Sequence, residues 1–237
     1  FPYYFQFTLT AYGKDLEPGL PEKTHLAAVF RELSRRLGKN RVVWRYDPVI
    51  CSEDWTIPRH LETFGRLAEE LKGAADTCVV SFLDRYRKIE KKLDQLGLRP
   101  PDSREREEFL RAAARMAATA GMELETCSEE GNYPSLGVRQ GSCISGKRIE
   151  EITGRKVTAS KDKTQRPSCG CLKSVDIGMY DTCAHGCVYC YASRSRELIG
   201  KNMGLARPDS PYLSGEPDGR EKITERDMPS VLGEPVR

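Results

Sequence analysis

The chain has 237 residues and 38% hydrophobic content, enough for a buried core in one large domain or two small ones. Its 38 basic and 35 acidic side chains give a formal charge of +3, so charge alone demands neither a nucleic acid nor an anionic membrane as partner. No run reaches the roughly 18 apolar residues that span a bilayer, and no signal-peptide pattern opens the sequence, so we expect a cytoplasmic protein without membrane contact. Because Phe1 already lies inside a hydrophobic run, we also expect upstream sequence of the same fold to be missing.

Segments rich in β-branched and aromatic residues predict four strands, at residues 3–10, 41–48, 78–84 and 122–129. Apolar residues at helical spacing predict helices between them, from Pro21 to Gly38, from Pro58 to Gly73, around 89–96, and from Asp102 or Ser103 to Gly121. Further short helices are expected near 149–152 and through Leu198. Strands that alternate with helices are typical of a parallel sheet, because a parallel neighbour requires a crossover connection.

The predicted fold class is α/β, a partial or truncated (β/α) TIM-type barrel with a C-terminal Cys-rich cluster-binding segment. Four strand–helix units are about half of an eight-stranded barrel, and no Gly-rich turn of a doubly wound sheet follows the first strand. Residues 1–130 would form the partial barrel, with N-terminal strands missing. Residues 131–200 would form the Cys-rich iron–sulfur or metal-binding segment, and residues 201–237 a polar, flexible tail without a core.

Alternation along the strands places polar side chains on one face, and these would point into the barrel if the apolar faces meet the helices. They are Gln6, Thr8, Arg45, Asp47, Ser81, Glu125 and Cys127. Barrel enzymes place their chemistry at the C-terminal mouth, so Arg45, Asp47 and Glu125 are candidate catalytic residues that contact a cofactor or substrate. The alternative is a satisfied ion pair of Arg45 with Glu125 or Asp47.

The sequence CAHGCVYC at residues 183–190 concentrates three cysteines in one short loop. Cys183, Cys187 and Cys190 have CxxxCxxC spacing, and three thiolates can hold three irons of a [4Fe–4S] cluster while the fourth iron stays open. Nine cysteines are an odd number, and a reducing compartment argues against a disulfide framework.

This spacing, with the aromatic Tyr189 before the third cysteine, resembles the signature of the radical S-adenosylmethionine superfamily. The resemblance implies S-adenosylmethionine bound and reductively cleaved at the cluster, Tyr189 near its adenine, and an electron donor such as a flavodoxin or ferredoxin; the substrate stays unknown. In that superfamily the motif ordinarily follows the first strand of the barrel, whereas here it follows the predicted strands. Segments such as VVWRYDPVI, ETCSEE, GSCISG and KDKTQRPSCGC together resemble a prokaryotic domain of unknown function family, number 1848, with a cysteine-rich C-terminus.

Four further cysteines, Cys127, Cys143, Cys169 and Cys171, are sufficient in number for a second, fully ligated cluster. The alternative is that Cys127 and Cys143 are small buried hydrophobic residues, as we expect for Cys51 and Cys78.

Zinc is the alternative to iron, because His185 adds a nitrogen to the three sulfurs of the loop. The chain would then be a zinc-stabilised binding module, with nucleic acid as a partner that the charge does not support. Redox-active thiols are the third interpretation of the loop. The other two histidines, His25 and His60, are expected on the surfaces of their helices.

Overall fold

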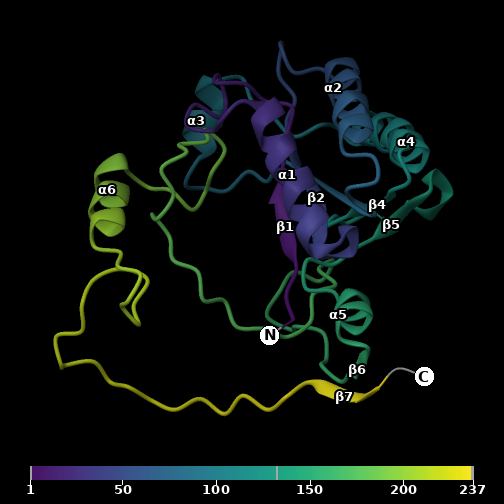
Figure 1. The fold of residues 1–237 in the computed structure, drawn as a ribbon. Helices are drawn as coiled ribbons and strands as arrows, with labels where there is room; N and C mark the ends of the chain where they lie inside the picture. The colour runs from purple at the N-terminus through teal and green to yellow at the C-terminus, as the bar shows by residue number, and fades with distance from the viewer. Residues whose placement is uncertain (1, 132, 236–237) are drawn as a thin grey trace.

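A five-stranded parallel sheet organises the computed structural model, which describes residues 2–131 and 133–235 (Figure 1). Its strands are β1 (Phe5–Thr8), β2 (Val42–Val49), β3 (Thr77–Phe82), β4 (Glu123–Thr126) and β5 (Val138–Gln140). They lie side by side in chain order, and every neighbouring pair is parallel. The predicted α/β class with a parallel sheet is therefore confirmed.

The helices between the strands begin and end close to the predicted positions. They are α1 (Lys23–Leu37), α2 (Ile57–Glu70), α3 (Glu90–Gln95) and α4 (Ser103–Thr119), with short 3-10 turns at Lys39–Arg41 and Pro134–Leu136. The start of α4 is fixed by a capping box: the Asp102 carboxylate accepts from the Glu105 amide, and the Glu105 carboxylate accepts from the Asp102 amide. The C-cap of α1 is Gly38, where a positive φ suits glycine.

The main core lies between one face of the sheet and the helices α1, α2 and α4. Trp44 of β2 stacks on Phe64 of α2, Tyr46 stacks on Phe109 of α4, and all four side chains are fully buried. Phe7 of β1 packs edge-on against Phe30 of α1. The apolar faces of the strands thus meet the helices, which leaves the polar face of the sheet for other contacts.

His60 of α2 is part of this buried region, so its predicted surface position is wrong. Its Nε2–H donates to the Ile50 carbonyl at 2.8 Å, and its Nδ1 accepts from the Tyr46 hydroxyl at 2.9 Å. Partners at both ring nitrogens make burial of a neutral imidazole acceptable. His25, by contrast, is exposed as expected.

A second, smaller core lies in the loops that follow the strands. It comes from the loops after β1, β2 and β3, from α3 and from the segment after α3, and consists of Tyr12, Leu16, Ile50, Trp55, Leu83, Ile89, Leu93 and Leu98. Val188 and Tyr189 of the cysteine loop pack against it. This core therefore gives the cysteine loop a surface to dock on at the carboxyl ends of the strands.

The described strands form an open sheet, with β1 and β5 at its edges. β5 was not predicted, because the three residues VRQ carry no alternating apolar pattern. Cys51 and Cys78 are both buried, as predicted.

After the sheet come α5 (Gly146–Thr153), β6 (Arg155–Val157), α6 (Arg196–Gly204) and β7 (Leu232–Pro235). The expected tail does contain a strand: β7 pairs antiparallel with β6 after the chain between α6 and β7 has run around the outside of the molecule (Figure 1). The end of that tail, residues 236–237, lies outside the described residues. Among the helices of the described chain, none combines the length and apolar character that a membrane crossing needs.

Candidate metal centre at the carboxyl ends of the strands

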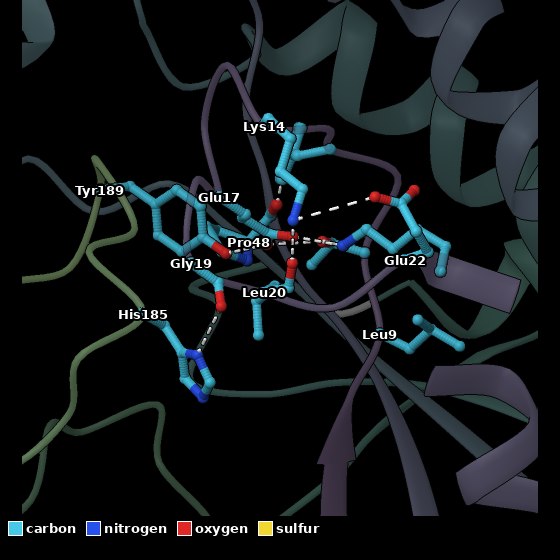
Figure 2. A network of polar contacts seen from close by, with 12 residues as sticks. Leu9, Lys14, Glu17, Gly19, Leu20, Glu22, Pro48, His185 and Tyr189 are labelled. Carbon is cyan, nitrogen blue, oxygen red and sulfur yellow. Dashed lines mark hydrogen bonds and ion pairs between the residues drawn. The ribbon is translucent and has the colours of Figure 1, made fainter. Parts of the chain in front are cut away.

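Main-chain hydrogen bonds dock the cysteine loop, residues 183–190, on the loop that follows β1. The Gly19 amide donates to the His185 carbonyl at 2.8 Å, and the Val188 amide donates to the Leu16 carbonyl at 2.9 Å. Position 19 must be glycine for this approach, because a Cβ there would lie 2.5 Å from the His185 carbonyl oxygen. The His185 ring also contacts the Gly19 carbonyl, with Nδ1 3.2 Å from the oxygen (Figure 2).

Tyr189 anchors the same loop through a buried carboxylate (Figure 2). Its hydroxyl donates to Glu17, whose side chain is 1% exposed and also pairs with Lys23 of α1. The Thr10 hydroxyl donates to the same Glu17 oxygen at 2.6 Å. Burial, followed by the negative charge of Glu17, raises the pKa of Tyr189, so the phenol stays protonated and remains a donor.

The three cysteines of the loop are free thiols. Cys183 is exposed, whereas Cys187 and Cys190 are partly buried and belong to one turn, closed by the Cys190 amide donating to the Cys187 carbonyl at 3.1 Å. Burial raises the pKa of Cys187 to about 11, and the charges of Glu17, Cys190 and Cys183 act in the same direction. The loop is held by its main chain and by Tyr189, so docking does not use the sulfurs.

The polar face of the strands carries a network centred on Arg45. Its guanidinium pairs with Asp47 and donates to the side-chain oxygen Oε1 of Gln6 at 2.6 Å, and the Ser81 hydroxyl donates to Asp47. The ion pair of Arg45 with Asp47, one of the two interpretations of this arginine, is thus present. Arg45 also reaches Cys143, with Nη1 2.6 Å from Sγ.

Four cysteines from three segments gather beside this network. The Cys127 and Cys143 sulfurs are 3.1 Å apart, and the Ile144 amide donates to the Cys171 sulfur at 3.4 Å. The hydrogen bond from Cys127, followed by the charge of Arg45 against the opposing effect of burial, lowers the pKa of Cys143. Burial raises the pKa of Cys171 to about 11 against the opposing hydrogen bond from the Ile144 amide, and the hydrogen bond with the Cys169 thiol and the charges of Cys143 and Cys169 act in the same direction as burial.

A cavity of about 440 Å³ lies between the strand ends and the cysteine loop, and we call it the strand-end cavity. Cys187, Cys190 and Tyr189 line it from the loop, while Arg45, Asp47, Ser81 and Cys127 line it from the strands. Tyr86 and Tyr191, whose ring centroids are 4.3 Å apart, contribute to its wall. Two cysteines of the loop, Cys187 and Cys190, and one of the second group, Cys127, therefore line one cavity.

Glu125 lies apart from Arg45 and Asp47. It lines a different cavity of about 540 Å³ on the polar face of the sheet, and its carboxylate is 3.7 Å from the guanidinium of Arg139. Burial raises the pKa of Glu125, against the opposing effect of Arg139. The structure thus brings two of the three candidate catalytic residues together and leaves the third on another part of the sheet.

Three residues at or near the strand-end cavity were not among the candidate site residues from the sequence. Glu129 accepts from the Phe82 amide at 2.9 Å, and burial raises its pKa. Arg166 pairs with Asp84 at 2.7 Å. Glu17 lies in KDLEPGLPEK, a stretch whose composition is that of any solvated loop, so only the fold reveals its burial.

Throughout residues 2–131 and 133–235, no three His, Cys, Asp or Glu side chains have their ligand atoms already arranged around a common metal position. The cysteine sulfurs instead hydrogen-bond to one another or to nearby polar groups, as the pairs Cys127–Cys143 and Cys190–Ser193 show. The fold therefore brings cysteine thiols close together without arranging them as ligands of a common metal ion in the described residues.

Comparisons with known proteins place the chain in a family without assigning a reaction. No curated protein and no solved structure shows significant similarity to the chain. A family model described as a domain of unknown function, DUF1848, matches residues 1–192, which include the sheet, its helices and all nine cysteines. The chain therefore belongs to the DUF1848 family.

Proposed function

We propose that this chain is an iron–sulfur protein of the radical S-adenosylmethionine type, in which Cys183, Cys187 and Cys190 hold a [4Fe–4S] cluster at the strand-end cavity. A cluster with three thiolate ligands supplies an open iron, at which bound S-adenosylmethionine can be reductively cleaved to start radical chemistry. The observation that carries the proposal is the cavity, which Cys187 and Cys190 line opposite Arg45 and Asp47.

The donor set of the loop suits this cluster. Three free thiols lie within eight residues, and the main chain, not the sulfurs, docks the loop. His185 has its Nδ1 3.2 Å from the Gly19 carbonyl oxygen, which leaves Nε2 as the nitrogen that a mixed zinc site would use. The three soft thiolates and their CxxxCxxC spacing favour an iron–sulfur cluster, and a zinc ion bound by these thiolates and His185 is the alternative that metal analysis tests.

The position of the loop supports the proposal as well. The superfamily motif ordinarily follows the first strand of the barrel, and here the cysteine loop comes late in the chain. It nevertheless docks against Leu16 and Gly19 of the loop that follows β1. A late segment thus reaches the part of the sheet where such a cluster would serve a cavity at the strand ends.

The cavity lining suits a ligand that carries both charges. Arg45 and Arg166 provide cations, while Asp47 and Glu129 provide carboxylates. The amino acid part of S-adenosylmethionine has an ammonium and a carboxylate, each of which can pair with one of these groups. Arg45 is held by Asp47 and Gln6, so its position is set before a ligand arrives.

We further propose that the open sheet is part of a (β/α) TIM-type barrel. Three observations support this: the strands follow chain order, α1, α2 and α4 cover the same face, and the uncovered face is polar. Chemistry at the carboxyl ends of the strands is the rule for such barrels. The proposed cluster also suits a reducing, cytoplasmic location and an electron donor such as a flavodoxin or ferredoxin.

The test is anaerobic purification of the full chain, with iron, sulfide and zinc measured per chain. After chemical reduction, we expect S-adenosylmethionine to be consumed and 5′-deoxyadenosine to form. A variant with alanine at positions 183, 187 and 190 should lose this cleavage. Cys51→Ala, which removes a buried cysteine outside the cavity lining, should retain it.

Zinc without iron in the wild-type chain would overturn the proposal and favour the zinc-stabilised binding module. Iron bound at the loop without cleavage of S-adenosylmethionine would also overturn it.

A further inference from the structure

We propose that Cys127, Cys143, Cys169 and Cys171 form a second metal centre, an iron–sulfur cluster ligated by four thiolates, on the strand side of the strand-end cavity. This centre is distinct from the three-cysteine loop and rests on different residues. It would stand even if the proposed function at Cys183, Cys187 and Cys190 failed.

The first step of the argument is that the fold brings these four cysteines together from distant positions. Cys127 follows β4, Cys143 follows β5, and the CGC segment at 169–171 comes after β6. The Cys127 and Cys143 sulfurs lie 3.1 Å apart without a disulfide. Unpaired cysteines that converge from three segments are typical of a metal site in a reducing compartment.

The second step is that hydrogen bonds hold the CGC segment against the other two. The Ser168 hydroxyl donates to the Ser128 carbonyl at 3.0 Å, and the Gln140 side chain donates to the Ser168 carbonyl at 2.8 Å. On the other side of the segment, the Leu172 amide donates to the Ile144 carbonyl at 3.1 Å. These bonds involve residues next to each of the four cysteines.

The third step is the close packing at the middle of this segment. A Cβ at Gly170 would lie 3.3 Å from the Gly141 carbonyl oxygen and 3.3 Å from the Ser142 Cβ. Glycine between two cysteines thus permits the CxC segment to lie against the loop that carries Cys143. Cys169 and Cys171 are both buried there.

The fourth step is charge. Arg45 Nη1 lies 2.6 Å from the Cys143 sulfur, so a cation already faces the site and would offset part of the negative charge of a tetrathiolate cluster. The Gln6 side-chain Nε2 donates to the Cys143 carbonyl, and the Tyr4 hydroxyl donates to the same carbonyl at 2.5 Å, which fixes the loop from the β1 side. Four thiolate ligands beside a cation, on loops held by hydrogen bonds, suit an iron–sulfur cluster.

The experiment compares metal content and visible spectra of three full-length chains purified anaerobically. The wild-type chain should hold about eight irons, and the alanine variant of positions 183, 187 and 190 should retain about four with a cluster spectrum. A variant with alanine at Cys169 and Cys171 should lose about half of the wild-type iron. Cys51→Ala serves as the control and should bind as much iron as the wild type.

The variants separate the two proposals. If the alanine variant of the loop retains a cluster while the wild type cleaves no S-adenosylmethionine, the second centre stands and the proposed function fails. If that variant binds no iron while the wild type cleaves S-adenosylmethionine with about four irons, the second centre is overturned.

X-ray absorption on the loop variant gives a readout that does not depend on substitutions at the site. Sulfur-only coordination of the retained iron supports the proposal. Zinc in place of iron, or a disulfide between Cys127 and Cys143 in the anaerobically purified wild-type chain, would refute it.

Discussion

Individual residues decide how the cysteine loop is oriented. Glu17 is buried, and Lys23, Thr10 and Tyr189 satisfy its carboxylate together. A buried charge is tolerated only where it is paired and hydrogen-bonded. The hydrogen bond from the Tyr189 hydroxyl to Glu17 is therefore needed to stabilise the buried carboxylate. This hydrogen bond fixes the ring of Tyr189, which lies between Cys187 and Cys190 in the loop.

Tyr189→Phe is therefore expected to loosen the loop while leaving the rest of the fold intact. Loss of one hydrogen bond to a buried carboxylate costs about 1–2 kcal/mol, which corresponds to roughly 5- to 30-fold faster opening of the docked loop. The Gly19 and Val188 amides donate between the cysteine loop and the loop after β1, so their hydrogen exchange measures this opening directly.

The matched control is Tyr191→Phe, since Tyr191 is 42% exposed and lies two residues further along. Its exchange rates should equal those of the wild type. Unchanged rates in both variants would show that the phenol of Tyr189 does not hold the loop.

At the scale of elements, packing between the loop after β1 and the cysteine loop brings the candidate ligands to the cavity. The two backbones approach so closely that Gly19 has no room for a side chain. This contact joins residues more than 160 positions apart, so it depends on the complete fold rather than on local propensity.

Gly19→Ala is expected to separate the two loops. A Cβ at 2.5 Å from a carbonyl oxygen must displace the backbone, and such overpacking costs about 1–3 kcal/mol. In the metal-free chain the partly buried Cys187 should then react with a thiol reagent roughly 5- to 150-fold faster.

Gly200→Ala in α6 provides the comparison, because a Cβ there meets nothing within 4 Å and alanine favours a helix. Its thiol reactivity should match the wild type. Equal reactivity of all three chains would contradict the role assigned to Gly19.

Elements with strong periodicity were predictable from the sequence, and those without it were not. The strands at 42–49 and 77–82 and the helices α1, α2 and α4 follow from apolar spacing and turn residues. β5, β6 and β7 have three or four residues, and β7 contains glycine and proline, so their pairing depends on tertiary contacts.

The residues of the candidate site also divide into those that the sequence predicts and those that it does not. CxxxCxxC is local and visible in the sequence, and strand parity placed Arg45 and Asp47 on the polar face. Glu125 is separated from Arg45 because β3 lies between their strands, and Glu17 is buried because of loop packing; a single sequence encodes neither locally.

At the scale of the whole molecule, two cores serve two purposes. The core between the sheet and its helices gives the strands a fixed frame, and the smaller core at the strand ends supports the loops around the cavity. His60 lies where they meet: it contacts Tyr46 and Phe109 of the first and Tyr12 and Trp55 of the second. A proton on His60 would therefore disturb both.

This position predicts how the stability of the whole fold depends on pH. Burial lowers the pKa of His60 below its usual value of 6.5, and the nearby charge of Arg59 acts in the same direction against the hydrogen bond to Ile50. The unfolded chain therefore binds the proton more readily than the folded chain. The free energy of unfolding should fall as the pH drops through 6.5, with this group contributing a slope of at most about 1.4 kcal/mol per pH unit.

Chemical denaturation of the metal-free chain between pH 5 and pH 8 measures this slope. His60→Gln should lower stability at all pH values, because glutamine does not reproduce both hydrogen bonds, but it should flatten the decline below pH 6.5. His25→Gln, at an exposed position of α1, should retain the wild-type slope. Since the chain has three histidines and His185 is exposed as well, a decline that survives in His60→Gln would show that its cause lies outside the buried imidazole.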